Sequence, residues 1–295
     1  MRLAAIDIGS NAVRLLISEV IREADGSLEF NKLNLVRVPL RLGMDVFQHG
    51  FISQTRTDMM LQTMCAYKHL MNAYQVEALK ACATSAMRDA KNSVNIISQV
   101  KERTGIDIEI ISGQQEASIL YENHIAENLD KTRSYLYIDV GGGSTEITLF
   151  SKNQMLFKES FNIGTIRILN NQVTEAHWGT LKDFIKNNIK TTTQPLVAIG
   201  SGGNINKVFS LSKRKEGKPL PLQLLKDYHK ELSSVSLHDR IQLYKLREDR
   251  ADVIVPALLI YINIMRWTNT EEIYVPKIGV ADGLIRILYN ELKGN

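Results

Sequence analysis

A strand, a glycine-containing turn and a second strand occur twice in this chain. The first copy contains Ile6-Asp7-Ile8-Gly9 and the second contains Ile138-Asp139-Val140-Gly141, so that Asp139 follows Asp7 by 132 residues. Repeats of a solenoid contain only about 20 to 50 residues. The long spacing therefore indicates two domains built alike, which agrees with a length of 295 residues.

The residues after each glycine turn distinguish it from a nucleotide-binding loop. Beyond Gly143, the residues of segment 145–150 alternate and are rich in β-branched types, which predicts a strand. A P-loop or a Rossmann loop would open a helix instead. We therefore expect two β-hairpin tips, where glycine permits positive φ and lets backbone N–H groups converge on an anion.

The position of the two aspartates indicates a metal. Asp7 and Asp139 end the strands beside the glycine turns, where a carboxylate would repel phosphate unless a cation lay between them. This predicts Mg²⁺ held largely through water. A third glycine-rich loop begins at Gly200, follows a predicted strand and precedes a helix expected at 205–211. The N-terminus of that helix would offer a further phosphate seat.

Apolar spacing and turn residues predict the other main elements. Asn92 or Ser93 is placed to cap a helix whose apolar face is marked by Val94, Ile97 and Val100. The remaining expectations are a hairpin turn at Asp25-Gly26, helices at 55–74 and 114–129, strands at 78–84 and 108–112, and a core helix at 253–262.

Composition narrows the class of protein. A net charge of +4 is compatible with an acidic substrate but is too small for a dedicated nucleic-acid binder. Two cysteines exclude a disulfide framework. The N-terminus lacks a signal-peptide pattern and the apolar segment 253–262 is too short to span a bilayer, so we expect a cytoplasmic protein. The charged segment 213–218 and the pair His238-Asp239 are interpreted as surface features.

Seven short motifs follow one another along the chain: Asp7 to Asn11, 83–90 with Asn92, 111–117, 139–146, 200–202, 250–252 and Asp282-Gly283. In this order they resemble the exopolyphosphatase/guanosine pentaphosphate phosphatase (Ppx/GppA) family, within the actin, hexokinase and Hsp70-like superfamily. The resemblance covers nearly the whole chain.

The resemblance implies an α/β fold with two RNase H-like (actin-like ATPase) domains that face each other across a cleft. The expected domains are residues 1–120 plus 280–295, and residues 121–279. A helix after Asp282 would return to the first domain, and the cleft would close around the substrate by a hinge motion.

The resemblance also implies roles for individual residues. Glu116 would be the general base that activates water, and Arg88 would clamp the transferred phosphate. Asp139 and Glu146 would bind the metal with support from Asp7, the metal being Mg²⁺ with Mn²⁺ as the alternative. The residues expected to bind phosphate are Gly9, Ser10, Asn11, Gly141, Gly142, Gly143, Ser144 and Gly202.

The chain departs from the family pattern in two places. Gln115 stands where the family often has a glutamate, next to the retained Glu116. The helical HD-type domains of longer members are expected to be absent, which leaves chain-length preference open. A homodimer is the oligomeric state that the family suggests.

The expected function is release of terminal phosphate from inorganic polyphosphate or guanosine pentaphosphate, and the sequence does not choose between them. Two alternatives stay open: a kinase of the same superfamily, and a polyphosphate or alarmone sensor with weak turnover. No nucleic-acid or membrane partner is expected.

Overall fold

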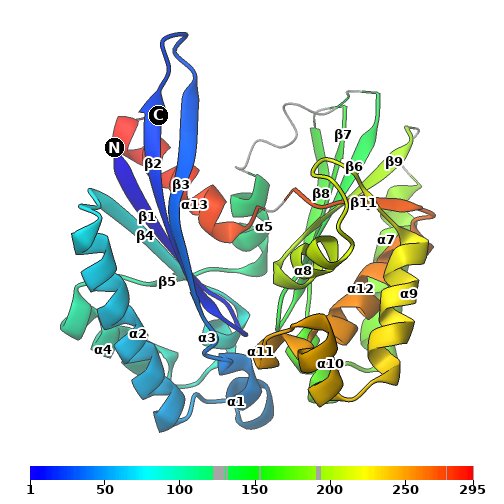
Figure 1. The fold of residues 1–295 in the computed structure, drawn as a ribbon, viewed down its shortest axis with the longest axis horizontal. Helices are drawn as coiled ribbons and strands as arrows, with labels where there is room; N and C mark the ends of the chain where they lie inside the picture. The colour runs from blue at the N-terminus through cyan, green and yellow to red at the C-terminus, as the bar shows by residue number, and fades with distance from the viewer. Residues whose placement is uncertain (122–129, 131, 153, 191–193, 277, 295) are drawn as a thin grey trace. The chain divides into compact units, whose positions relative to one another are not determined.

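The computed structural model describes residues 1–121, 130, 132–152, 154–190, 194–276 and 278–294. The chain forms two compact units (Figure 1). Unit 1 contains Met1–Asn123 together with Gly279–Asn295, and unit 2 contains His124–Ile278.

The two units are built around sheets of the same topology. In unit 1 the order is β3-β2-β1-β4-β5, with β1, β4 and β5 parallel and β2 and β3 antiparallel to their neighbours. In unit 2, β8-β7-β6-β9-β11 repeats this pattern and β10 is added at the edge. The predicted α/β fold with a repeated architecture is therefore confirmed.

The elements of unit 1 are β1 (Arg2–Ile8), β2 (Val13–Arg22), β3 (Leu28–Val38), α1 (Leu42–His49), α2 (Gln54–Ala73), β4 (Ala78–Ala83), α3 (Ser85–Asp89), α4 (Ser93–Thr104), β5 (Glu109–Ile110), α5 (Gly113–Tyr121) and α13 (Val280–Lys293).

The elements of unit 2 are β6 (Ser134–Val140), β7 (Thr145–Ser151), β8 (Gln154–Phe161), α6 (Thr165–Leu169), α7 (Glu175–Ile189), β9 (Leu196–Ser201), α8 (Gly203–Leu211), β10 (Leu220–Pro221), α9 (Leu222–Ser234), α10 (Leu237–Tyr244), α11 (Glu248–Ala251), α12 (Ile254–Trp267) and β11 (Glu272–Tyr274).

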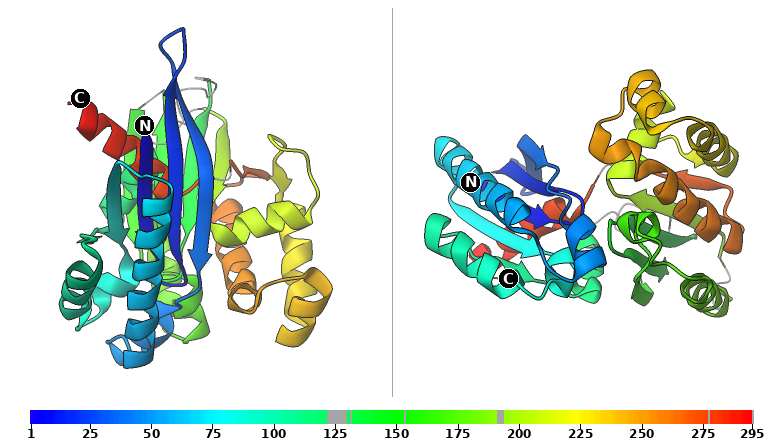
Figure 2. Two further views of the ribbon diagram at one scale, coloured as in Figure 1. Left: turned by 60° about the vertical axis from the view of Figure 1, so that its left-hand side comes forward. Right: turned by 90° about the horizontal axis from the view of Figure 1, so that it is seen from below.

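Helices cover both faces of the sheet in unit 1. On one face, the hydroxyl of the buried Tyr67 of α2 donates a bifurcated hydrogen bond to the carbonyl oxygens of Val13 and Val36. On the other face, α13 packs against Leu3 and Ala5 of β1, and α5 packs against α13. Figures 1 and 2 show the red helix α13 lying against the blue strands of unit 1. Burial of its apolar face joins the C-terminal segment to the first strands.

The core of unit 2 is centred on α12. This helix is apolar around most of its circumference, and Pro256 lies in its first turn, where a missing N–H costs no hydrogen bond. The core helix predicted at 253–262 is confirmed, and it continues to Trp267. No helix in the described part of the chain is both long and apolar enough to cross a bilayer.

Several local predictions are confirmed. Gly26 has φ of 85° in the turn between β2 and β3, and α2 matches the helix expected at 55–74. His238, Asp239 and the segment 213–218 are exposed. The predicted helix at 114–129 matches α5 as far as Tyr121, while 122–129 lie outside the described residues.

The prediction for α4 was wrong in two details. Its buried face consists of Ser93, Ile96, Val100 and Thr104, whereas Val94 is 78% exposed. Asn92 is the N-cap residue, but its side chain does not cap the helix. It exchanges two hydrogen bonds with the backbone of Ile52 instead, so that a tertiary contact replaces the local one.

The contact between α5 and α13 depends on Gly283. A Cβ atom at this position would lie 1.9 Å from the carbonyl oxygen of Ile119. We expect Gly283→Ala to lower the free energy of unfolding by about 1–3 kcal/mol, because the helices must move apart. Gly179→Ala in α7 is the matched control. It has open space around it and should raise stability by up to about 1 kcal/mol. Urea unfolding measures the change in the free energy of unfolding for both variants. Equal changes would contradict the conclusion that the contact between α5 and α13 depends on Gly283.

Cys82 of β4 carries a pH-dependent part of the stability. Burial raises the pKa of its thiol well above the ordinary value of 9.0, and the charges of Asp7 and Glu116 add to this. Above pH 9 the unfolded chain releases the thiol proton while the folded chain retains it, so stability falls as the pH rises. The stability difference between the wild type and Cys82→Ala should therefore shrink by about 1 kcal/mol from pH 8 to pH 10. A difference that is the same at both pH values would contradict this.

Candidate active site

The two glycine turns have the same hydrogen bond. Gly9 N–H donates to the carbonyl oxygen of Ala12 at 3.1 Å, and Gly141 N–H donates to that of Ser144 at 2.9 Å. A Cβ atom at either glycine would lie 3.2 Å from that oxygen, which explains the glycine. Gly9, Gly141, Gly142 and Gly143 do not adopt the positive φ that glycine permits at such tips. The glycines permit close approach of the backbone rather than a left-handed conformation.

The carbonyl groups of the second turn are held by the start of α6. The N–H groups of Thr165 and Ile166 donate to the carbonyl oxygens of Gly141 and Gly142, and Arg167 Nε donates to that of Gly143 at 2.7 Å. In a trans peptide the carbonyl and the following N–H point in opposite directions. The N–H groups of Gly142, Gly143 and Ser144 are therefore directed away from α6, in an arrangement suited to an anion.

Gly164 makes this arrangement possible. It precedes α6, and a Cβ atom there would lie 2.4 Å from the carbonyl oxygen of Gly142. No side chain fits at that distance without moving the turn.

The first turn is held in a similar way by the start of α1. The N–H groups of Gly43 and Arg41 donate to the carbonyl oxygens of Ser10 and Asn11. The hydroxyl of Ser10 also accepts a hydrogen bond from the N–H of Ala86 and pairs with Ser85 Oγ at 2.8 Å. Ser10 thereby joins the turn to α3, the helix that carries Arg88.

The residue opposite each aspartate differs between the units. In unit 1, Asp7 pairs in register with Arg14, and the two form an ion pair of 2.7 Å with the Asp7 side chain 6% exposed. In unit 2 the corresponding pair is Asp139 with Glu146. Like charges opposite each other on neighbouring strands destabilise a sheet unless a cation offsets them.

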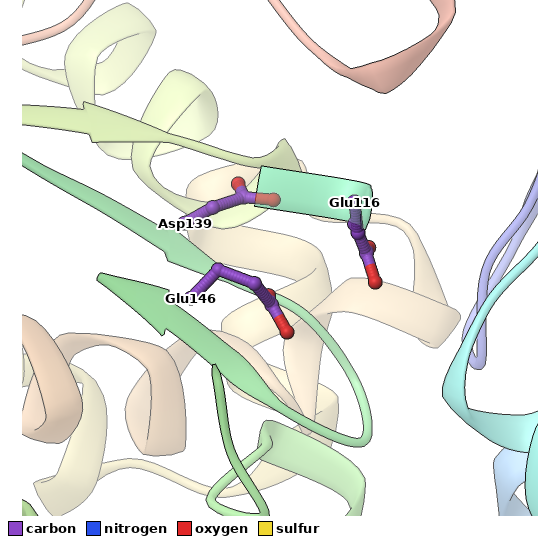
Figure 3. A group of neighbouring side chains, drawn as sticks. All are labelled: Glu116, Asp139 and Glu146. Carbon is purple, nitrogen blue, oxygen red and sulfur yellow. The ribbon is translucent and has the colours of Figure 1, made fainter. Parts of the chain in front are cut away.

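Asp139 and Glu146 form the candidate metal site. Each offers a carboxylate oxygen within 4.8 Å of the other's. Figure 3 shows both side chains projecting from the neighbouring strands β6 and β7. Oxygen ligands from carboxylates are those that Mg²⁺ and Mn²⁺ prefer. The residues present therefore fit the predicted divalent ion, whereas Asp7 has an arginine as its neighbour.

Gly202, expected to bind phosphate, has a second structural reason to be glycine. Its φ is 109°, and a Cβ atom would lie 3.2 Å from Oδ1 of Asp139. The loop after β9 can pass the carboxylate only without a side chain.

Glu116 lies in the first turn of α5 and is buried; it is the third labelled side chain in Figure 3 and belongs to unit 1. The departure at Gln115 has a local explanation. Gln115 Oε1 accepts from the N–H of Ser112, and Ser112 Oγ accepts from the N–H of Gln115, so the two form a capping box. Glutamine supports the start of α5 as glutamate would.

Arg88 is connected to the same helix start. Its Nη1 donates to the carbonyl oxygen of Ile111 at 2.9 Å, immediately before Ser112. The guanidinium has five N–H donors, so this bond leaves others for a ligand. Within unit 1, this hydrogen bond therefore joins Arg88 of α3 to the segment just before α5, the helix that carries Glu116.

Sequence reasoning missed three residues near the turns, namely Arg14, Gly164 and Arg167. Arg14 had a usable signal, because it occupies the position of Glu146 in the repeat. Gly164 and Arg167 had none beyond a glycine before a short helix.

The chain is similar to several known proteins. A model of the Ppx/GppA phosphatase family matches residues 19–292. The bifunctional 3-dehydroquinate synthase/phosphatase of Fusobacterium nucleatum is 29% identical over 92% of this chain, which spans only 44% of that protein. Exopolyphosphatase 1 of Mycobacterium bovis is 25% identical over 100% of this chain and 90% of its own.

A solved structure shows the same fold. The crystal structure of the Aquifex aeolicus Ppx/GppA family member has a TM-score of 0.76 and 26% identity, covering 100% of this chain and 99% of that one. This chain therefore has the actin-like fold of that structure. Because the family match extends over most of its length, this chain belongs to the Ppx/GppA phosphatase family.

Proposed function

We propose that this chain is a divalent-metal-dependent phosphohydrolase that releases terminal phosphate from inorganic polyphosphate or guanosine pentaphosphate. The observation that carries the proposal is the pairing of Asp139 with Glu146 beside a turn whose N–H groups are directed away from α6. Membership in a phosphatase family supports the same reaction class.

Asp139 and Glu146 would hold the ion, Mg²⁺ or Mn²⁺, with Asp7 as a more distant support. When bound, the ion supplies positive charge that offsets the negative charge of the phosphoryl group. The backbone of the two turns, at Gly9, Ser10, Asn11 and 141–144, with Gly202 of the third loop, binds the terminal phosphates. Phosphoryl transfer depends mainly on such positioning and charge stabilisation.

Glu116 acts as the general base. It lies in the first turn of α5, near the positive end of the helix dipole. As a carboxylate it takes a proton from the water that attacks the terminal phosphorus. Arg88, held at the start of the same helix, grips the phosphoryl oxygens.

The organisation of the protein completes the proposal. In this proposal, residues 1–120 with 280–295 and residues 121–279 are the two actin-like domains of a cytoplasmic homodimer without nucleic-acid or membrane partners. Two free cysteines suit a reducing compartment.

The general base is tested by Glu116→Gln. Loss of the proton acceptor should lower phosphate release by about 10²–10⁴-fold while labelled substrate still binds. Glu109→Gln, the same change at an exposed residue of β5, is the control and should keep normal turnover. Near-normal turnover of Glu116→Gln would exclude this role.

The metal site is tested without substrate by titrating Mn²⁺ and recording its electron paramagnetic resonance signal. Asp139→Asn and Glu146→Gln should each weaken Mn²⁺ binding by at least about 10-fold. Loss of a residue that only hydrogen-bonds to a metal ligand already has an effect of that size. Glu272→Gln, the same change at an exposed residue of β11, serves as the control and should bind as the wild type does. Unchanged Mn²⁺ affinity in both site variants would place the ion elsewhere.

The substrate is identified by measuring phosphate release side by side on short polyphosphate, long polyphosphate and guanosine pentaphosphate. Transfer of phosphate to an acceptor without free phosphate would indicate a kinase. Tight binding without hydrolysis over hours would indicate a sensor.

A further inference from the structure

Asp139 is held by a hydroxyl group from the neighbouring strand. Ser201 ends β9 and pairs in parallel register with Asp139. Its Oγ donates a hydrogen bond of 2.7 Å to Oδ1 of Asp139. The bond restrains the orientation of the carboxylate.

Ser201 is itself held by a buried tyrosine. Tyr261 of α12 is 1% exposed, and its hydroxyl donates to the carbonyl oxygen of Ser201. Burial raises the pKa of Tyr261 well above its ordinary value, with a further contribution from Asp139, so the hydroxyl keeps its proton. A chain of two hydrogen-bonded residues thus leads from the core helix to the carboxylate.

Glu146 has an equivalent support on its other side. Ser160 of β8 pairs in register with Glu146, and its Oγ donates to Oε1 at 2.8 Å. Each carboxylate of the candidate metal site therefore has one oxygen engaged by a serine hydroxyl.

The corresponding positions of unit 1 show that these serines are not required by the sheet. Cys82 pairs with Asp7 as Ser201 pairs with Asp139, and Arg37 pairs with Arg14 as Ser160 pairs with Glu146. A thiol is a weak donor and an arginine is a cation. Serine hydroxyls thus accompany the like-charge pair in unit 2, while unit 1 has other residue types at both positions.

We propose that Ser201 and Ser160 are positioning residues for a divalent ion at Asp139 and Glu146, and that Tyr261 acts through Ser201. This inference rests on the proposed metal site. Hydrogen bonds to ligating carboxylates orient the ligands, and their loss typically weakens metal binding by about 10- to 100-fold. The serines contact the ligands and not the substrate.

The test is Mn²⁺ binding to the full chain, followed by electron paramagnetic resonance without substrate. Ser201→Ala and Ser160→Ala should each raise the dissociation constant by about 10-fold or more. Ser201→Thr retains the hydroxyl and should return most of the affinity. The matched control is Ser134→Ala, which removes a buried hydroxyl bonded to Ser151 at the opposite end of β6. It should bind Mn²⁺ as the wild type does.

Tyr261→Phe separates positioning from simple loss of stability. If Tyr261 acts through Ser201, the double variant with Ser201→Ala should bind Mn²⁺ no more weakly than Ser201→Ala alone. Phosphate release by Ser201→Ala should recover at saturating Mn²⁺, because the variant lacks affinity and not chemistry.

The inference would be overturned if the alanine variants bound Mn²⁺ like the wild type, or if Ser134→Ala lost as much affinity as Ser201→Ala. If the losses of Mn²⁺ affinity caused by Tyr261→Phe and Ser201→Ala were additive in the double variant, Tyr261 would not act through Ser201. The proposed function fails by a different result. Full activity of Glu116→Gln would contradict the general base, but it would not change the Mn²⁺ affinities of the serine variants.

Discussion

The antiparallel register between β6 and β7 places Asp139 directly opposite Glu146, and the surroundings of the candidate site depend on that juxtaposition. Two carboxylates at this separation repel each other, so the structure must supply compensation or bind a cation. Neighbouring residues are adapted to the pair. Hydroxyl groups from β9 and β8 donate to the two carboxylates, and Gly202 keeps the next loop clear of Asp139.

The same sheet is used differently in unit 1. There the equivalent register pairs Asp7 with Arg14, and the ion pair takes the place of a like-charge pair. Burying a paired charge costs less than burying a lone one, so Arg14 offsets the cost of burying Asp7 in the sheet. The repeat thus preserves the strand order and the turn, while single substitutions at matching positions change the electrostatics.

Backbone geometry explains how both turns present their N–H groups. In each unit, N–H groups at the start of the helix that follows the third strand donate to carbonyl oxygens of the turn. These carbonyls belong to Ser10 and Asn11 in unit 1 and to Gly141 and Gly142 in unit 2. Because each peptide group is planar and trans, a carbonyl that is held in place also fixes the N–H of the next residue, which points in the opposite direction. Such preorganised dipoles need no rearrangement when charge develops on a bound group.

Sequence alone was sufficient for the features that depend on local pattern. The repeat of Asp7 and Asp139, the strands after the glycines and the apolar helix around Leu258 all follow from spacing and side-chain type. Tertiary structure decided the rest. Val94 is apolar yet exposed, and Asn92 bonds to Ile52, because those outcomes depend on distant segments. Ser160 and Ser201 lie 14 and 62 residues from the carboxylates that they hold, and only strand pairing brings them into contact. Periodicity reports which face of an element is buried, whereas register between distant strands determines which side chains meet.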